Sequence, residues 1–439
     1  MPTIAAHTLG CKVNQYDTEA MLELFEGAGY RIVPFDAEAD IYLVNTCTVT
    51  GTGDSKSLKL IRRLGREHPK ARLIVTGCMA QRDPASLNLP GVCLIVGTRE
   101  RGRVVSLYEE AAASGKTRCA VSSLKNAPFE NLRVTRHEGK TRAVMKIQEG
   151  CDRFCSYCII PAVRGGVRSM PLEQVRAEAE RLAQSGYREL VVTGIHLASY
   201  GRELGADLVD ALKVIHGVDG VERIRLGSLE PLTVDDRFIE ALDRMPKLCP
   251  QFHVALQSGC DTVLKRMKRR YDTAQYTDAV TRLRRALPRC AVTTDVLTGF
   301  PGETDEEAEA TLRFVEKIAF ARIHVFPYSR RKGTVADLLP DQVPEPVKKR
   351  RCEQLIRLGN KLECDYVSKT VGTVRKVLFE NASEGFTPEY VRVSAQGEAG
   401  RILPVLITSA EGTLARGRVL DRTAQLKGAF DAHGGLPVL

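Results

Sequence analysis

The chain has 439 residues, of which 43% are hydrophobic, and a formal net charge of +10 at pH 7. This length exceeds what one hydrophobic core usually organises, so we expect two or three domains. The N-terminus lacks the basic start of a signal peptide, and no segment approaches the roughly 20 apolar residues that span a bilayer, so we expect a cytoplasmic protein without a membrane span. In that compartment an odd total of 13 cysteines argues against a disulfide framework and favours metal ligation or catalysis.

The first part of the chain, residues 3–113, alternates apolar runs with amphipathic stretches. Three of the apolar runs cover residues 41–44, 72–75 and 92–96. The alternation predicts an open α/β sheet with largely parallel strands, and we place this domain at residues 1–115. Residues 114–140 are polar and broken by glycine and proline, which is typical of a linker.

The central part of the chain, placed at residues 137–366, has a longer series of alternating strands and helices. Strand candidates cover residues 143–148, 189–193, 223–227, 252–256, 291–297 and 322–326. Residues 171–184 form one of the intervening helices, because they open with a proline and repeat apolar residues on one face. Six such units predict a partial (βα)6 barrel, since a closed eight-unit barrel usually needs about 250 residues.

After a basic helix candidate at residues 347–362, the pattern changes to short β-like runs separated by glycine turns, from residue 372 to about 426. We therefore expect a small all-β barrel at residues 369–430. The predicted fold class is a multidomain α/β protein with an open sheet, a partial barrel and a small β-barrel in that order.

Three cysteines lie close together directly after the first barrel strand. Cys151, Cys155 and Cys158 have the spacing C-x3-C-x2-C. Three thiolates in one short loop can hold three irons of a 4Fe-4S cluster and leave the fourth iron open to an outside ligand. The alternative is a zinc site whose fourth ligand comes from elsewhere in the chain, with candidates Cys249, Cys260 and His196.

With the aromatic Tyr157, this triplet resembles the motif of the radical S-adenosylmethionine (radical SAM) superfamily. The resemblance implies that S-adenosylmethionine chelates the open iron and is cleaved to a 5'-deoxyadenosyl radical. Small and polar residues follow the other barrel strands, where the functional groups of βα barrels gather. As candidates to bind the cofactor we name Tyr157, Thr193, Gly194, Ser228, Glu230, Gln257 and Asp295, each of which could instead serve a turn or a helix cap.

Three further cysteines, Cys11, Cys47 and Cys78, are far apart in sequence, but each follows a predicted strand of the first domain. Because the carboxyl ends of parallel strands share one edge, the three thiolates could converge on one metal centre. The alternative is that they are buried cysteines that pack as small apolar residues.

The contexts of these cysteines resemble the three signatures of the methylthiotransferase family, at residues 8–16, 45–50 and 77–81. The resemblance extends over nearly the whole chain and implies a second, auxiliary 4Fe-4S cluster on Cys11, Cys47 and Cys78 and a C-terminal TRAM-like, RNA-binding barrel. Within the family, residues 11–14 and 385–391 look most like the MtaB branch. Met170, Asp17 and residues 51–57 depart from the usual family pattern.

The MtaB resemblance implies methylthiolation of C2 of N6-threonylcarbamoyladenosine at position 37 of tRNA, with one S-adenosylmethionine as radical source and a second as methyl donor. Implied partners are the tRNA anticodon loop, an unidentified electron donor and an unidentified sulfur source. The alternatives are isopentenyladenosine in tRNA or ribosomal protein S12 as substrate, or a non-enzymatic iron-sulfur protein that binds RNA or senses redox state. Basic clusters at residues 268–270, 330–332 and 348–351 could attract RNA or be solvated helix faces. No acid-base pair is evident, and we name no catalytic base.

Overall fold

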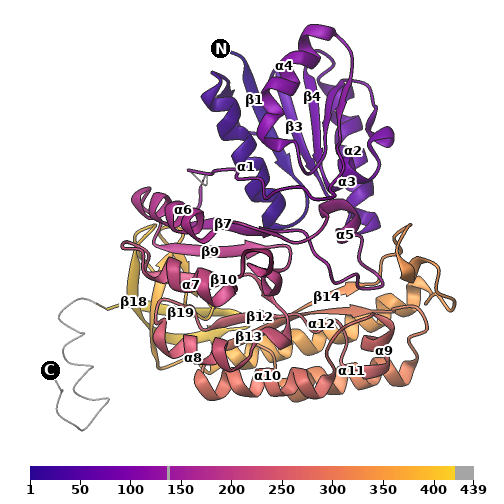
Figure 1. Ribbon diagram of the computed structural model, residues 1–439. Coiled ribbons are helices and arrows are strands. Elements are labelled where there is room, and N and C mark those ends of the chain that lie inside the picture. Colours follow the sequence, from indigo (N-terminus) through magenta and orange to yellow (C-terminus); the bar gives the residue numbers. More distant parts are fainter. Residues whose placement is uncertain (136–138, 421–439) are drawn as a thin grey trace.

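The computed structural model describes residues 1–135 and 139–420, and three units follow one another along these residues (Figure 1). Residues 421–430 of the predicted third domain and residues 137–138 of the second lie outside the described part. Among the described residues, no helix is both long and apolar enough to cross a membrane.

The first unit is a six-stranded, fully parallel sheet in the order β2-β1-β3-β4-β5-β6. Its strands are β1 (Thr3–Thr8), β2 (Arg31–Ile32), β3 (Ile41–Thr46), β4 (Arg72–Gly77), β5 (Val92–Val96) and β6 (Arg118–Ala120). Its helices are α1 (Lys12–Gly27), α2 (Gly51–Glu67), α3 (Cys78–Arg82) and α4 (Val104–Ser114). β3 is buried along its whole length, which explains its continuous apolar run.

The predicted linker at residues 114–140 is partly wrong, because it contains β6, which pairs with β5 at the edge of this sheet. β6 has only three residues, none of them buried, so its sequence carries neither an apolar run nor a clear alternation. The open parallel α/β sheet itself is confirmed.

The second unit is a partial barrel built from two four-stranded sheets, β10-β9-β7-β8 and β11-β12-β13-β14. Its strands are β7 (Arg142–Glu149), β8 (Arg168–Ser169), β9 (Glu189–Gly194), β10 (Arg223–Leu226), β11 (Ser228–Leu229), β12 (Gln251–Val254), β13 (Ala291–Thr298) and β14 (Arg322–Pro327). Its helices are α5 (Ile160–Arg164), α6 (Leu172–Gln184), α7 (Leu208–His216), α8 (Asp236–Arg244), α9 (Asp261–Arg266), α10 (Thr273–Ala286) and α11 (Asp305–Ile318). All six predicted strands are present, and the predicted helix at residues 171–184 is α6, with Pro171 as its N-cap.

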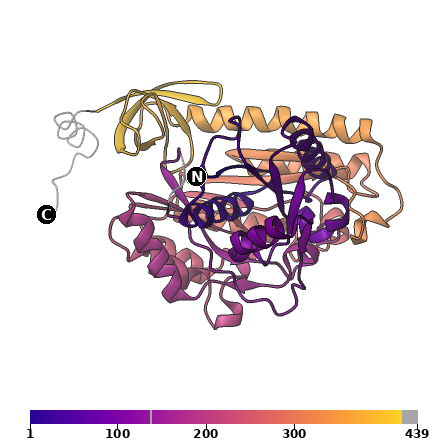
Figure 2. The same cartoon turned by 90° about the horizontal axis from the view of Figure 1, so that it is seen from above.

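The third unit begins after the long helix α12 (Glu345–Ser368), which extends the predicted basic helix at both ends. It is a closed five-stranded barrel, β15-β16-β17-β19-β18, as the sequence predicted. The strands are β15 (Val374–Phe379), β16 (Glu384–Phe386), β17 (Arg392–Ser394), β18 (Ile402–Glu411) and β19 (Leu414–Val419). Viewed from above, this barrel lies beyond one end of α12 (Figure 2).

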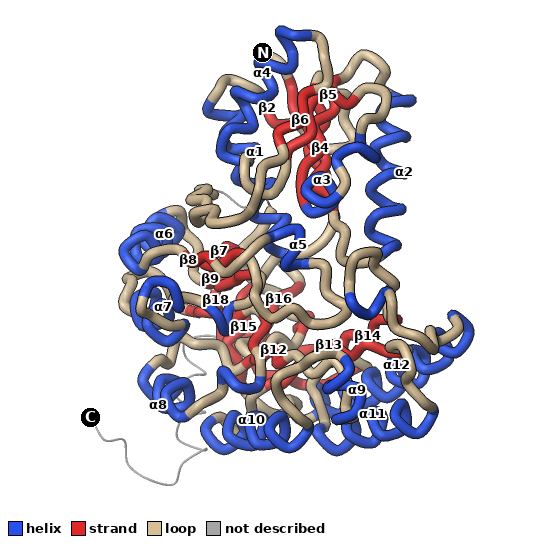
Figure 3. Tube along the Cα trace, turned by 45° about the vertical axis from the view of Figure 1, so that its right-hand side comes forward, coloured by secondary structure: helices blue, strands red, loops and turns tan. Residues whose placement is uncertain are grey.

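Several interfaces hold the units together, and two of them involve the barrel strands. In the first, Tyr16 and Ala20 of α1 pack against Val144 of β7 and Val191 of β9, so that α1 covers one face of these barrel strands. The neighbouring residues of the same strands face the main core under α6 and α7. In the second, the C-terminal barrel is bound to β10 through arginine side chains. Figure 3 shows the first unit standing on the partial barrel, with α5 between them.

Candidate functional site

The loop after β7 carries the first cysteine triplet. It begins at Gly150, whose φ of +74° favours glycine, and a Cβ there would lie 1.9 Å from the carbonyl oxygen of Gly166. The backbone N–H of Cys151 donates to the carbonyl of Gly165 (3.0 Å), and that of Cys158 donates to the carbonyl of Cys155 (2.9 Å). The chain therefore turns tightly and brings all three thiols to one end of the barrel.

The three thiols lie within electrostatic reach of one another. Burial, together with the neighbouring thiols, raises the pKa of Cys151 to about 11 and that of Cys158 to about 12. Metal binding would have to displace protons from these thiols. Arg269 stands on the other side of the loop, and its Nη1 donates to the Sγ of Cys155 at 3.2 Å. Tyr157 packs edge-on against Phe300, with ring centroids 6.5 Å apart.

Glu230, predicted as a cofactor contact, is buried among the side chains of two arginines and one histidine. Its carboxylate lies 3.1 Å from Arg153 Nε, 3.2 Å from His196 Nε2 and 3.2 Å from Arg269 Nη2. Burial alone would raise the pKa of Glu230, but His196, Arg269 and Arg153 outweigh it and lower the pKa to about 2. This carboxylate therefore braces Arg269, the residue that touches Cys155.

The remaining predicted cofactor residues lie at the carboxyl ends of the barrel strands. At the end of β9, Thr193 is buried, and a Cβ on Gly194 would lie 2.8 Å from that of Gln148. Ser228 in β11 is exposed. Gln257 has a φ of +69°, and its N–H donates to the carbonyl of Asp295 in β13 (2.9 Å). Thr193, Gly194, Ser228, Gln257 and Asp295 thus surround the same end of the barrel as the cysteine loop.

The second triplet gathers at the carboxyl edge of the first sheet. Cys11 is the N-cap of α1, Cys47 directly follows β3, and Cys78 is the first residue of α3. A Cβ on Gly10 would lie 3.2 Å from the Sγ of Cys47. Asn14 lies between the three segments, because its Nδ2 donates to the carbonyls of Leu9 (2.8 Å) and of Thr46 (3.0 Å). The sheet edge therefore does bring the three cysteines together, as their positions after strands predicted.

The environments of these thiols differ. Cys11 is exposed, Cys47 is partly buried and Cys78 is fully buried. Burial raises the pKa of Cys47. Burial also raises the pKa of Cys78, and with the opposing effects of Arg164 and Cys11 included this pKa is about 11. Two of the three cysteines also stand at helix N-termini, where the positive end of the helix dipole favours anionic thiolates.

Each triplet supplies three thiols, the donor groups that hold an iron-sulfur cluster. No group of three or more His, Cys, Asp or Glu side chains among residues 1–135 and 139–420 is placed to hold one metal ion. A 4Fe-4S cluster binds each thiolate at a separate iron, so its cysteines are more widely spaced than the ligands of one ion. Each triplet also has an arginine N–H directed at one sulfur, at Cys78 and at Cys155. Hydrogen bonds of this kind surround metal-bound thiolates.

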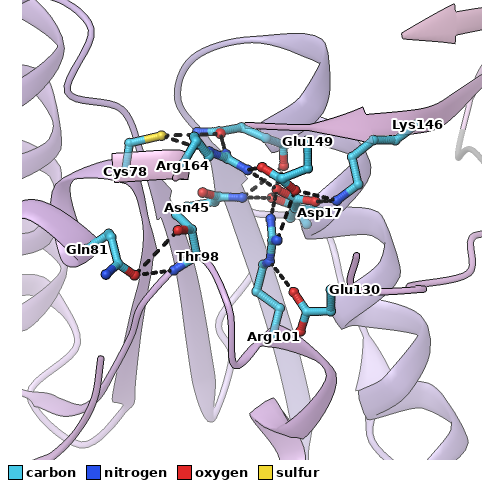
Figure 4. Close-up of polar contacts among 12 residues, drawn as sticks. Asp17, Asn45, Cys78, Gln81, Thr98, Arg101, Glu130, Lys146, Glu149 and Arg164 are labelled. Carbon is cyan, nitrogen blue, oxygen red and sulfur yellow. Dashed lines mark hydrogen bonds and ion pairs between the residues drawn. The ribbon is translucent and has the colours of Figure 1, made fainter. Parts of the chain in front are cut away.

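A buried network of charges lies between Cys78 of the second triplet and Glu149, which is two residues before the first triplet, and no sequence pattern indicated it (Figure 4). Arg164 of α5 contacts residues of both units: its Nε lies 3.2 Å from Cys78 Sγ, and its Nη1 lies 2.9 Å from Asp17 Oδ2 and 2.6 Å from Glu149 Oε1. Arg101 and Lys146 also bind both carboxylates. The available signal was the presence of the charged residues Lys146 and Glu149 in a barrel strand, close to the apolar residues 143–145 and Ile147.

Lys12, next to Cys11, interacts electrostatically with charged residues of the other two units. It is exposed, and no hydrogen bond or ion pair is found for it among the described residues. The partial enclosure lowers the pKa of its ammonium group, and the charges that act on it belong to Tyr390, Arg142, Arg225 and Glu189. Lys12 of the first signature and Tyr390 of the C-terminal barrel are therefore neighbours, although they are far apart in sequence.

Only part of each predicted basic cluster is free to bind RNA. Arg269 is engaged with Cys155 and Glu230, and Arg331 is buried against Asp54. In the third cluster, Lys348 and Arg351 are buried. Each cluster keeps its other members at the surface.

Comparisons with known proteins agree with this architecture. Residues 3–97 match the uncharacterized protein family UPF0004, and residues 145–315 match the radical SAM superfamily. The chain is 42% identical to the threonylcarbamoyladenosine tRNA methylthiotransferase MtaB of Bacillus subtilis over 428 residues, which cover 93% of this chain and 94% of that protein. The MtaB of Thermotoga maritima is 40% identical over 382 residues, or 87% of each chain. A tRNA-2-methylthio-N(6)-dimethylallyladenosine synthase of Pelotomaculum thermopropionicum is 35% identical over 421 residues, with coverage of 91% and 94%.

Among solved structures, the radical S-adenosylmethionine methyltransferase TsrM of Kitasatospora setae, with cobalamin and a 4Fe-4S cluster bound, aligns with a TM-score of 0.59 at 15% identity, over 76% of this chain and 77% of that chain. At this identity the likeness shows the fold alone. Membership of the radical SAM superfamily implies a 4Fe-4S cluster and S-adenosylmethionine as cofactors. The extent and identity of the curated relatives show more: the chain is an enzyme of the radical SAM methylthiotransferase family and belongs to its MtaB branch.

Proposed function

We propose that this enzyme adds a methylthio group to C2 of N6-threonylcarbamoyladenosine at position 37 of tRNA. The observation that carries the proposal is the presence of two cysteine triplets in two different units, brought together at one junction. Cys78 packs against Ile159 and Val163, which directly follow the first triplet. A single triplet would be sufficient to generate a radical. Insertion of sulfur needs a second site that holds sulfur close to that radical.

The chain's own residues position the two sites. When bound, the cluster of Cys151, Cys155 and Cys158 would supply the electron that cleaves S-adenosylmethionine, and the cluster of Cys11, Cys47 and Cys78 would supply the sulfur that a second S-adenosylmethionine methylates. Hydrogen-bonding groups at the carboxyl ends of the barrel strands are the proposed partners of S-adenosylmethionine: Tyr157, Thr193, Ser228, Glu230, Gln257 and Asp295. Gly194 allows Gln148 to pack closely against the end of β9, because a Cβ there would meet Gln148.

The substituent on N6 of the adenosine follows from charge. A threonylcarbamoyl group carries a carboxylate, whereas a dimethylallyl group is apolar. Lys12 places a cation without an ion-pair partner among the described residues beside Cys11, with Arg142 near it. An unpaired cation in a partly enclosed space favours the carboxylate-bearing substituent. The names of the curated relatives with 42% and 40% identity support the same choice.

We further propose that the C-terminal barrel and α12 supply part of the tRNA surface. Exposed members of the basic cluster at the start of α12, such as Lys349 and Arg350, would contact phosphates, which position RNA without reading its sequence. Deletion of residues 370–439 should weaken tRNA binding and reduce its dependence on salt. Unchanged affinity and salt dependence would contradict this assignment.

Two experiments test the proposed function. Anaerobic reconstitution followed by an assay for 5'-deoxyadenosine should show product from the wild-type protein and none from Cys155→Ala. A fully iron-loaded wild-type protein that produces no 5'-deoxyadenosine would contradict the radical chemistry. Nucleoside mass spectrometry of tRNA from a deletion strain should show loss of the methylthio group from threonylcarbamoyladenosine only. Loss from isopentenyladenosine instead, or from ribosomal protein S12, would identify the alternative substrates.

A further inference from the structure

The candidate sites are joined by one side chain that belongs to neither triplet. Arg164 lies at the end of α5 in the barrel unit and is fully buried. Its Nε donates to Cys78 Sγ at 3.2 Å, and its Nη2 donates to Asn14 Oδ1, so it contacts two of the segments that carry the second triplet (Figure 4). Its Nη1 binds Glu149, which is two residues before Cys151. One guanidinium group thus connects the two cysteine-bearing loops.

The carboxylates of the network leave one N–H of Arg164 for the thiol. The ion pairs of the network join three cationic side chains, Arg101, Lys146 and Arg164, to three carboxylates, Asp17, Glu130 and Glu149, so their charges balance. The Nε of Arg164 takes no part in these ion pairs and faces Cys78. A hydrogen bond from a charged donor is stronger to an anion than to a neutral acceptor, so this N–H would favour Cys78 as a thiolate bound to iron.

Stability alone does not account for such a network. Replacing buried ion pairs by apolar side chains of similar size often leaves stability unchanged or raises it. The network does hold one N–H at a fixed position on the sulfur, because Asp17 and Glu149 both bind Nη1 of Arg164 and leave its Nε directed at Cys78. Hydrogen bonds to ligand sulfurs are among the factors that set the reduction potential of an iron-sulfur cluster.

We propose that Arg164 is a positioning residue that sets the reduction potential of the auxiliary cluster through Cys78 and fixes this cluster relative to the first cysteine loop. The inference rests on the proposed second cluster. A cation and an N–H donor at the thiolate stabilise the more electron-rich, reduced state, so Arg164 raises the potential. In the barrel unit, Arg269 has the equivalent contact with Cys155, which indicates that each triplet has its own arginine.

The test measures the midpoint potential of the auxiliary cluster by redox titration with electron paramagnetic resonance. It uses the full chain with Cys151, Cys155 and Cys158 each changed to Ala, so that only one cluster titrates. In this background, Arg164→Lys keeps the positive charge but removes the directed Nε–H, and Arg164→Gln removes the charge as well. We expect Arg164→Gln to lower the midpoint potential, so that at a fixed potential the ratio of reduced to oxidised cluster falls at least tenfold. For a one-electron couple, a tenfold change in this ratio corresponds to 59 mV. Arg164→Lys should have a smaller shift of the same sign.

Arg101→Lys is the matched control, because Arg101 binds the same two carboxylates, Asp17 and Glu149, without a contact to a cysteine. Its midpoint potential should equal that of the parent protein at equal iron and sulfide content. An unchanged potential in both Arg164 variants at full iron content, or an equal shift in Arg101→Lys, would overturn the inference. Neither tRNA nor S-adenosylmethionine is present, so this result is independent of the proposed substrate and reaction.

Discussion

The attachment of the C-terminal barrel to the partial barrel should depend on Arg225. This side chain is 2% exposed; its Nε binds Glu189 at 2.7 Å, and its Nη1 donates to the carbonyl of Pro388 at 2.9 Å. Arg225→Met would leave Glu189 with only Arg223, at 3.3 Å. Removing one partner of a buried ion pair costs about 3–5 kcal/mol of stability in typical cases. Because Arg223 still pairs with Glu189, the cost lies below the upper end of this range, and we expect the free energy of attachment to fall by about 4 kcal/mol.

Because Arg225 binds the C-terminal barrel, the loss should appear as detachment of that barrel before the rest unfolds. Native-state proteolysis at the junction between α12 and β15 measures this opening, and about 4 kcal/mol corresponds to cleavage faster by roughly a thousandfold when reclosing outpaces cleavage. Arg416→Met is the matched control, since Arg416 pairs with Glu411 at the surface of the same barrel and should leave the rate unchanged. Equal cleavage rates in the two variants would refute the reasoning.

Three further predictions follow from single residues. Gly150→Ala should deplete iron at the first triplet, because the added Cβ meets the Gly166 carbonyl. Gly115→Ala is the control: Gly115 has a similar positive φ but open space around it, so the iron content should stay full. Equal iron depletion in both variants would contradict this prediction. Lys12→Met should reduce kcat/KM on threonylcarbamoyladenosine tRNA about tenfold, as expected for one lost ion pair, and Lys12→Arg should recover part of the loss. An equal loss of kcat/KM on dimethylallyladenosine tRNA would contradict recognition of the carboxylate by Lys12. Glu230 has a lowered pKa, so its ion pairs contribute stability above pH 4.5 that is lost as pH falls toward 2; in urea unfolding of the metal-free protein, the wild type should lose about 3 kcal/mol more than Glu230→Gln over that range, because the other carboxylates with lowered pKa values titrate in both proteins. An identical pH dependence in Glu230→Gln would contradict the ion-pair assignment.

The sequence was sufficient for the features that local patterns determine. Strand β9 carries an apolar run because it is buried along almost its whole length, and the helix at residues 172–184 shows its buried stripe and its proline start. The two triplets were predicted for different reasons: one from spacing within a loop, the other from the rule that parallel strands end at one edge. The suggestion of a non-enzymatic protein is wrong, since the chain belongs to an enzyme family.

Features that depend on tertiary contacts could not be predicted in this way. Arg164 directly precedes Gly165 and Gly166, and this local sequence does not indicate that its side chain is buried. Only the tertiary fold places its guanidinium between Cys78 and Glu149. Glu230 was predicted as a cofactor contact, but the two arginines and one histidine around it come from separate loops whose positions no local pattern encodes. Likewise, the proximity of Lys12 to Tyr390 depends on how α1 and the C-terminal barrel both dock on the partial barrel.

The most direct test of the account is a product analysis with the reconstituted enzyme, S-adenosylmethionine, a reductant and tRNA that carries threonylcarbamoyladenosine. The wild-type protein should produce both 5'-deoxyadenosine and the 2-methylthio nucleoside. Cys78→Ala should still produce 5'-deoxyadenosine but no methylthio product, because the first triplet remains and the sulfur site is lost. Methylthio product from Cys78→Ala, or none from a wild-type protein with both clusters loaded, would contradict the division of labour between the two triplets.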